Sequence, residues 1–261
     1  MTQIVSIHSY RGGTGKSNLS ANLAASMALL GKRVALVDTD IQSPGVNVIF
    51  KLDEATISDT LNNYLWGECA VTDIAHNVTQ VLHEESGQMA NGSLYLIPSS
   101  MKSKDIAKVL GEGYDVELLQ EGLEELSGQL ELDYLFIDTH PGLNEETLLA
   151  VGISDMLVII LRPDQQDYLG TGVVVEVAEN LEVPETILVV NKVLPDFDLD
   201  ALKQKVEETY KKTVSGILPL SNEMLRLGSQ GLFCCRFPEH DLTQELNQIV
   251  TKIRTLEAVR T

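Results

Sequence analysis

The sequence lacks most features that would place the protein outside a cell or inside a membrane. Its 261 residues include only three cysteines, and these form neither a disulfide framework nor a CxxC metal site. Its longest apolar runs, such as residues 156–161, are far shorter than the roughly 20 residues that span a bilayer. The first residues lead into an apolar run without a basic leader. We therefore expect a cytoplasmic protein with reduced thiols.

Basic residues are scarce as well. The chain has 19 Lys and Arg against 38 Asp and Glu, a formal net charge of −19. This balance argues against broad attraction to nucleic acid or anionic lipid. The deficit lies in residues 1–200, which hold 10 basic and 31 acidic side chains, whereas residues 201–261 hold 9 and 7. The C-terminal part therefore leaves room for one positive face.

Extended and helical patterns alternate along the chain, with no repeat and no flexible linker. Short apolar, β-branched runs predict seven buried strands, at residues 4–9, 33–38, 94–98, 134–138, 156–162, 186–192 and 214–218. Helical spacing predicts helices at 17–30, 115–130, 143–151, 170–181, 198–210 and 242–256. Residues 66–93 are polar and weakly periodic, so we expect a surface excursion there. The alternation predicts one α/β domain over residues 1–261, with a mostly parallel, doubly wound sheet flanked by helices on both faces.

The segment between the first predicted strand and helix has the composition of a phosphate-binding loop, Ser9-Tyr10-Arg11-Gly12-Gly13-Thr14-Gly15-Lys16-Ser17-Asn18. Its glycines let consecutive backbone amides face an anion, and the following helix adds the positive end of its dipole. Lys16 supplies a charge for the β- and γ-phosphates, and the Ser17 hydroxyl can bind Mg²⁺. A GxGxxG dinucleotide pattern fails because Asn18 stands where the third glycine belongs. The sequence therefore predicts a P-loop NTPase.

The loop departs from the ordinary GxxxxGK[ST] pattern, because Tyr10 replaces its first glycine. What remains resembles the deviant Walker A loop of the ParA/MinD family of positioning ATPases. In that family a signature lysine, at the position of Arg11, reaches across a dimer to the partner's phosphates. The resemblance implies ATP and Mg²⁺ as ligands, an ATP-dependent homodimer, and Lys16, Asp40 and Arg11 as catalytic residues. The nucleotide contacts that it implies in the loop are Arg11, Gly12, Gly13, Thr14, Gly15, Lys16, Ser17 and Asn18.

Three carboxylates extend the resemblance beyond the loop. The segments Gly31-Lys32-Arg33-Val34 and Val37-Asp38-Thr39-Asp40 match the family, which implies that Asp40 orients the attacking water and that Asp38 lies near the metal's hydration shell. The strand that ends in Asp138 has the Walker B pattern, so Ser17, Asp38 and Asp138 are the expected metal site. Carboxylates that end strands beside a phosphate loop suit this chemistry independently. His140 is unusual in the family's second switch, and we expect a solvent-facing or locally hydrogen-bonded side chain rather than a catalytic one.

The predicted base is adenine. Asn191-Lys192-Val193-Leu194 resembles the NKxD motif of GTPases, but Leu194 replaces the aspartate that reads guanine. In ParA/MinD relatives this asparagine lies at the adenine edge. The segment from Pro219 to Pro238 resembles the family's C-terminal IPxxxxxxxA…G segment, which implies that Pro219 flanks the base. We therefore expect Asn191 and Pro219 to contact ATP.

Arg11 leaves two interpretations open. Its guanidinium keeps a permanent charge and grips phosphate oxygens with a planar fork, so it could act across a dimer like an arginine finger. Alternatively, Arg11 holds its own loop and another cation crosses the interface. Some carboxysome-positioning members of the family lack the signature lysine and use a lysine distant from the loop.

The resemblance implies a switch in which the ATP-bound dimer binds a surface and a small adaptor protein stimulates hydrolysis. We expect non-specific nucleoid DNA as the surface, and a plasmid, chromosome or carboxysome as the cargo. The candidate phosphate contacts are Lys203, Lys205, Lys211, Lys212, Arg226 and Arg236. A solvated lysine-rich helix is the rival interpretation for the first four. The predicted helix at 242–256 has mixed charge and no aromatic anchor, so packing on the sheet is favoured over membrane binding.

Two other classes of function remain open. One is a MinD-like regulatory ATPase that acts through protein partners or a membrane without binding DNA. The other is a metabolic P-loop enzyme such as an ATP-dependent ligase, for which the sequence shows no separate substrate motif. An iron–sulfur carrier of the same superfamily is disfavoured by the absence of CxxC.

Overall fold

A computed structural model describes residues 2–52 and 56–258 of the chain. Within these residues, eight strands form one sheet in the order β3-β4-β2-β5-β1-β6-β7-β8. Only the edge strand β3 runs antiparallel to its neighbour. The strands are β1 (Gln3–His8), β2 (Arg33–Asp38), β3 (His76–Asn77), β4 (Ser93–Ile97), β5 (Tyr134–Asp138), β6 (Met156–Leu161), β7 (Glu185–Val193) and β8 (Thr213–Pro219).

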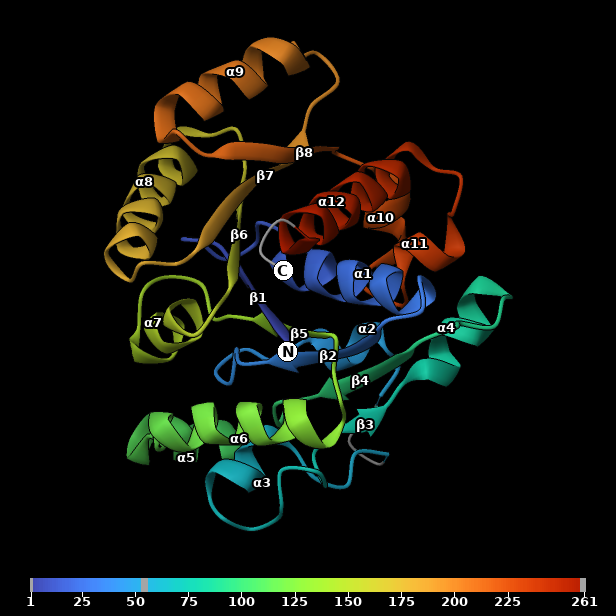
Figure 1. Cartoon of the computed structure of the whole chain (residues 1–261), viewed down its shortest axis with the longest axis vertical. Coiled ribbons are helices and arrows are strands. Elements are labelled where there is room, and N and C mark those ends of the chain that lie inside the picture. The colour runs from blue at the N-terminus through green and yellow to red at the C-terminus, as the bar shows by residue number, and fades with distance from the viewer. Residues whose placement is uncertain (1, 53–55, 259–261) are drawn as a thin grey trace.

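Helices cover both faces of this sheet (Figure 1). One face carries α1 (Lys16–Leu29), α2 (Val46–Ile49), α4 (Thr79–Ser86), α11 (Phe233–Arg236) and α12 (Asp241–Ala258). The other carries α3 (Leu61–Leu65), α5 (Ser103–Glu112), α6 (Val116–Gln129), α7 (Glu145–Gly152), α8 (Gln165–Asn180) and α9 (Leu199–Tyr210). The short α10 (Asn222–Leu227) follows β8. The doubly wound, mostly parallel fold predicted from the sequence is confirmed.

Alternation along the buried strands explains why both faces need a cover. In β2, Val34 and Leu36 join the core beneath α1, whereas Ala35 and Val37 join the core beneath α6. All four side chains are fully buried. Because successive side chains of a strand point to opposite faces, an unbroken apolar run must lie between two layers of helices. The same alternation places the acidic ends of β2 and β5 next to each other, with Asp38 in register with Asp138.

The seven predicted strands are all present, but the expectation for residues 66–93 is wrong. This stretch is no surface excursion, because it supplies β3 at the sheet edge and α4 on the α1 face. Val78 and Leu82 are buried in the core, and the side chain of Glu85 is only 2 % exposed. The helix α4 is short, and its few apolar residues stand among polar ones, so they show little periodicity. The sequence pattern therefore did not predict this helix. The helix predicted at 170–181 begins earlier, at Gln165, where Asp164 caps it by accepting from the amides of Gln166 and Asp167.

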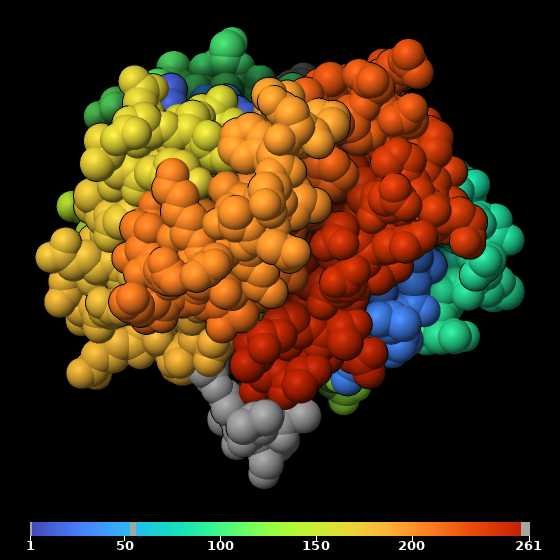
Figure 2. All heavy atoms as spheres, turned by 90° about the horizontal axis from the view of Figure 1, so that it is seen from above, coloured from blue at the N-terminus to red at the C-terminus, as the bar shows by residue number. Residues whose placement is uncertain are grey.

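The C-terminal helix α12 packs on the sheet, as its sequence predicted. Leu246, Ile249 and Ile253 are buried in the core shared with α1 and the strands. Gly216 of β8 permits this approach, because a Cβ there would lie 2.6 Å from Ile249 Cδ1. Both α12 and α9 contact β8. Figure 2 shows the face of the molecule where α12, in red, and α9, in orange, reach the surface. Among the described helices, none has the length and apolar character needed to cross a bilayer.

Candidate nucleotide-binding site

The phosphate loop joins β1 to α1 at the carboxyl edge of the sheet. Gly13 and Gly15 have φ angles of 77° and 101°, in the left-handed region that disfavours side chains. At Gly15 a Cβ would also lie 2.6 Å from Asn191 Nδ2. Among the described residues, no side chain caps the first turn of α1, so its first amides have no side-chain partner there. Free amides at a helix N-terminus favour a bound anion.

This loop encloses a cavity of about 190 Å³. Its lining consists of loop residues, the first turn of α1 and two residues from neighbouring strand ends: Ser9, Gly12, Gly13, Thr14, Gly15, Lys16, Ser17, Asn18, Asp40 and Pro141. The structure therefore brings together the predicted loop contacts and Asp40. Arg11 is missing from this lining, because its side chain points to α8.

At the floor of the site, Lys16 meets the Walker B carboxylate. Lys16 Nζ lies 3.1 Å from Asp138 Oδ1, which also accepts from the Ser20 hydroxyl at 2.8 Å. Asp138 Oδ2 is buried and accepts no hydrogen bond from the described residues. A buried carboxylate oxygen without a donor fits a site that is completed by a cation or by its bound water.

Asp38 lies beside Asp138 but has a different set of partners. One of its oxygens accepts from the amides of Gly45 and Val46, at 3.1 and 3.2 Å, and the other accepts from the amide of Asp40. Burial, together with the charge of Asp138, raises the pKa of Asp38 to about 7. Its carboxylate therefore holds the loop after β2, and its predicted place near the metal's hydration shell stays a prediction. No cluster of three or more His, Cys, Asp or Glu that could hold a metal occurs among the described residues. Mg²⁺ needs only one or two protein ligands when phosphate oxygens and water complete its shell.

Asp40, which lines this cavity, is hydrogen-bonded to His140. His140 Nδ1 lies 2.6 Å from Asp40 Oδ1, and both side chains are largely buried, at 24 % and 12 % exposure. The His140 side chain is therefore hydrogen-bonded to a residue 100 positions away in the chain. Behind this pair lies His8, whose Nδ1 is 2.7 Å from Thr139 Oγ1. Burial lowers the pKa of His8 to about 3, and the positive charges of Lys16 and His140 add to the effect.

Arg11 contacts two carboxylates of its own chain. Its Nη1 lies 3.5 Å from Asp167 Oδ1 and 3.7 Å from Asp164 Oδ1, at the start of α8. Asp167 is also held by Arg162, through its backbone amide at 2.9 Å and its Nε at 3.0 Å. Asp167 therefore keeps a full set of donors whether or not Arg11 stays beside it.

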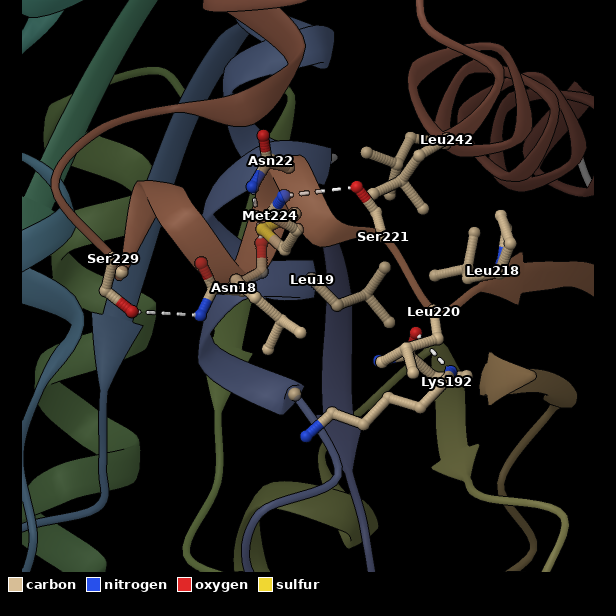
Figure 3. Close-up of a pocket in the computed structure, with 16 residues that line it drawn as sticks. Asn18, Leu19, Asn22, Lys192, Leu218, Leu220, Ser221, Met224, Ser229 and Leu242 are labelled. Atoms are coloured by element: carbon tan, nitrogen blue, oxygen red, sulfur yellow. Dashed lines mark hydrogen bonds between the residues drawn. The ribbon is translucent and has the colours of Figure 1, made fainter. Parts of the chain in front are cut away.

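A second cavity, of about 210 Å³, opens next to the phosphate loop (Figure 3). Gly15 and Asn18 line both cavities, so the two adjoin. The predicted residues Asn191 and Pro219 line it. The sequence did not predict nucleotide contacts for the remaining lining, which is Leu19, Asn22, Lys192, Leu218, Leu220, Ser221, Met224, Leu225, Gly228, Ser229, Leu242 and Leu246. These residues come from four separate parts of the chain, so only the tertiary structure brings them together.

Two neighbouring residues of β7 connect this cavity to the phosphate loop. Asn191 Nδ2 donates to the Thr14 carbonyl at 2.8 Å, and Lys192 Nζ donates to the Gly13 carbonyl at 2.7 Å. Lys192 has a φ of 58°, a left-handed conformation that is uncommon outside glycine. The sequence predicted that Asn191 lies near the base. The structure shows in addition that the side chains of Asn191 and Lys192 both hold the phosphate loop by hydrogen bonds.

The cations expected to bind DNA do not form one uncompensated patch. Lys212 pairs with Glu179 at 2.8 Å, and Arg236 pairs with the buried Glu85 at 2.8 Å. Lys205 lies 5.0 Å from the ring of Tyr168, and Arg226 lies 4.0 Å from Glu223. Lys203 and Lys211 make no ion pair within the described residues.

The fold and the two adjoining cavities are those of a P-loop nucleotide-binding protein, and known proteins agree. The family model described as an AAA domain matches residues 2–187. The chain is 31 % identical to the septum site-determining protein MinD of Bacillus subtilis, over 74 % of this chain and 66 % of that protein. An uncharacterized ATP-binding protein of Methanocaldococcus jannaschii is 24 % identical over 97 % of this chain and 88 % of its own length.

The solved structure of MinD from Pyrococcus horikoshii, complexed with Mg-ADP, superposes with a TM-score of 0.82. It covers 100 % of this chain and 99 % of that chain at 20 % identity, which shows a shared fold. The chain belongs to the AAA domain family, and within it to the ParA/MinD ATPases. It spans about two thirds of the length of Bacillus subtilis MinD.

Proposed function

We propose that the chain binds Mg-ATP across the two adjoining cavities and hydrolyses it as the timing step of an ATP-dependent dimer. The observation that carries this proposal is the position of Gly15 and Asn18, which line both cavities. When the triphosphate occupies the loop cavity, the ribose and base of the same nucleotide extend into the adjoining second cavity. Asn191 lines the second cavity and also donates to the Thr14 carbonyl of the phosphate loop. The nucleotide is therefore held at its phosphates by the loop and at its base by the second cavity.

Each loop residue has a role that its geometry supports. Lys16, now 3.1 Å from Asp138, can turn to the β- and γ-phosphates without leaving the cavity that it lines. Ser17 and Asp138 are the metal contacts that fit best, because Ser17 lines the cavity and Asp138 Oδ2 lacks a donor. When bound, Mg²⁺ neutralises charge on the phosphate oxygens. Asp40 lines the same cavity and can accept a proton from, and orient, a water that attacks the terminal phosphate.

The base cavity favours adenine over guanine. Guanine is read by a carboxylate that accepts from its N1–H and amino group, and no Asp or Glu of the described residues lines this cavity. Leu194, at the position of that carboxylate in the GTPase motif, is 45 % exposed and outside the lining. The lining instead offers amide and hydroxyl groups on an apolar wall.

Titration of fluorescent ATP and GTP analogues tests this part of the proposal. We expect Mg²⁺-dependent ATP binding, at least tenfold weaker GTP binding, and loss of ATP binding in Lys16→Ala. Equal affinity for both nucleotides would contradict the assignment of the base cavity.

The dimer is supported by the surface around Arg11. A shallow groove beside the phosphate loop is lined by Tyr10, Arg11, Gln166, Leu169, Gly170 and Val173. Leu169 is 68 % exposed and Tyr10 is 40 % exposed, so an apolar surface lies next to the charge of Arg11. We infer that a second copy covers this groove when Arg11 moves from α8 to the partner's phosphates. Light scattering with and without a slowly hydrolysed ATP analogue measures this association.

We further propose that this dimer binds DNA non-specifically and is therefore nucleoid-associated. It would move a plasmid, chromosome or carboxysome cargo with the help of a small adaptor protein. Lys203, Lys205 and Lys211 on or beside α9 are the least compensated of the candidate cations. Binding should require ATP, and its affinity should fall by about 0.9 log unit per log unit of salt for each phosphate contacted. The triple Ala variant should abolish binding while leaving ATP hydrolysis unchanged. Binding without ATP, or without salt dependence, would contradict it.

A specific observation favours the alternative, a MinD-like regulator that acts through protein partners. Lys212 and Arg236 are engaged by acids of the same chain, which weakens the predicted DNA face. Co-sedimentation with DNA separates the two, because the regulator remains in solution with ATP present.

A further inference from the structure

We propose that His140 is a positioning residue that holds Asp40 in the orientation needed to direct the attacking water. This inference rests on the proposed role of Asp40. It concerns the pair formed by His140 Nδ1 and Asp40 Oδ1, which are 2.6 Å apart. The two residues lie 100 positions apart in the chain and belong to the loops that follow β5 and β2.

Asp40 faces the loop cavity, and His140 contacts Asp40 from outside the lining of that cavity. Asp40 and Pro141 line the loop cavity, whereas His140 is absent from the lining. A catalytic residue must touch the substrate or the water that reacts, and His140 does not reach that space. It contacts instead the side chain that does. His140 therefore acts through Asp40.

The two carboxylate oxygens of Asp40 have different partners. Oδ1 accepts from His140 Nδ1 and from the amide of Ser43 at 3.1 Å. Oδ2 accepts no hydrogen bond from the described residues. Two donors on one oxygen fix the rotation of the carboxylate and leave the other oxygen for a water in the cavity.

His140 can hold Asp40 in place because the backbone on both sides of His140 is itself fixed by hydrogen bonds. Thr139 Oγ1 donates to the Ile7 carbonyl at 3.0 Å, and the amide of Gly142 donates to the Ser9 carbonyl at 3.2 Å. The carbonyl of His140 accepts from Thr147 Oγ1 at 3.2 Å. The loop after β5 is thereby tied to β1 and to α7, so the imidazole presents its Nδ1 to Asp40 from a fixed position. Neutral imidazole with its proton on Nδ1 and imidazolium both donate this bond, so the inference does not depend on protonation.

Single-turnover and steady-state hydrolysis of Mg-ATP by two variants of His140 tests the inference. His140→Phe keeps the size of the ring but removes the donor, and His140→Asn keeps a donor near the position of Nδ1. We expect His140→Phe to lower kcat by about tenfold to a hundredfold, the scale of a misplaced catalytic group, with KM changed by less than about twofold. His140→Asn should retain kcat within about threefold of the parent chain. A purely structural role would lower thermal stability in both variants alike, and would give no rescue by Asn.

A double-mutant cycle with Asp40→Asn separates this inference from the proposed function. If His140 acts through Asp40, adding His140→Phe to Asp40→Asn slows hydrolysis no further. If the two losses multiply, or if His140→Phe alone keeps the parental kcat, the inference about His140 is wrong while Asp40 keeps its role. If Asp40→Asn itself hydrolyses ATP at the parental rate, the assignment of Asp40 fails, and the inference fails with it.

Discussion

The ammonium group of Lys192, at the carboxyl end of β7, donates a hydrogen bond to the carbonyl oxygen of Gly13 in the phosphate loop at 2.7 Å. The two residues lie 179 positions apart. This contact ties the loop to β7. It makes the shape of the phosphate cavity depend on a strand whose side chains also line the base cavity.

Replacement of Lys192 by Met should weaken Mg-ATP binding by about tenfold. The variant keeps the length of the side chain but loses the charged donor, and a hydrogen bond from a charged group contributes about 1.5 kcal/mol at the lower end of its range. Isothermal titration measures the affinity. Lys211→Met is the matched control, because Lys211 has a similar φ of 54° but lies at the end of α9 and makes no hydrogen bond to the phosphate loop among the described residues. Equal loss in both variants would contradict the bracing role.

Replacement of Arg11 by Ala should abolish ATP-dependent dimerisation and leave ATP binding by the monomer intact. Within one chain, the Arg11 side chain is 38 % exposed, and Arg162 still donates to the buried Asp167 when Arg11 is removed. The free energy of unfolding should therefore change by no more than about 0.5 kcal/mol. Light scattering with an ATP analogue measures the dimer.

Arg11→Lys tests whether charge or the planar guanidinium carries the contact, and Arg226→Ala, a change at an 80 % exposed side chain, controls for loss of a surface charge. Normal dimerisation of Arg11→Ala would show that another cation crosses the interface.

Acid should destabilise the protein partly through His8. The pKa of His8 in the folded chain is about 3, against an ordinary value of 6.5. The unfolded chain therefore takes up a proton below pH 6.5 that the folded chain refuses, so stability is complete above this pH and is lost as the pH falls towards 3. Between pH 7 and pH 5 the loss from this group is about 2 kcal/mol.

His8→Asn removes this titration and keeps a donor for Thr139. Urea unfolding at pH 7, 6 and 5 should show a shallower decline for the variant than for the parent chain. Parallel curves would show that another group is responsible.

Removal of the charge on Glu85 should destabilise the fold by about 1–3 kcal/mol, the scale for leaving charged partners unsatisfied. The Glu85 carboxylate is 2 % exposed and binds Lys51 at 2.7 Å, Arg236 at 2.8 Å and the amide of Leu232. It connects α4 to the segments after α2 and before α11. Chemical unfolding of Glu85→Gln measures the loss. Glu84→Gln, the exposed neighbour on the same helix, should change stability by less than about 0.5 kcal/mol.

Local patterns predicted most of the architecture. The strands that end at Asp38 and Asp138 were visible as apolar runs, because a strand buried on both faces carries no polar residue until it leaves the core. The phosphate loop was visible because its glycines, Lys16 and Ser17 are contiguous, and each is required by backbone shape or charge. The edge strand β3 could not be predicted, because a strand of two residues is too short to show an alternation of apolar and polar side chains.

What the sequence by itself determined is therefore the set of elements that depend on neighbours in the chain: the alternation of strands and helices, the phosphate loop and the acidic strand ends. Only the tertiary structure decided which distant side chains meet there. It placed His140 on Asp40, turned Arg11 towards Asp167, and brought Lys192 to Gly13. These contacts join residues 100 to 179 positions apart. A hydrogen bond between such residues depends on how strands are ordered in the sheet, and strand order leaves no mark in a local pattern of residues.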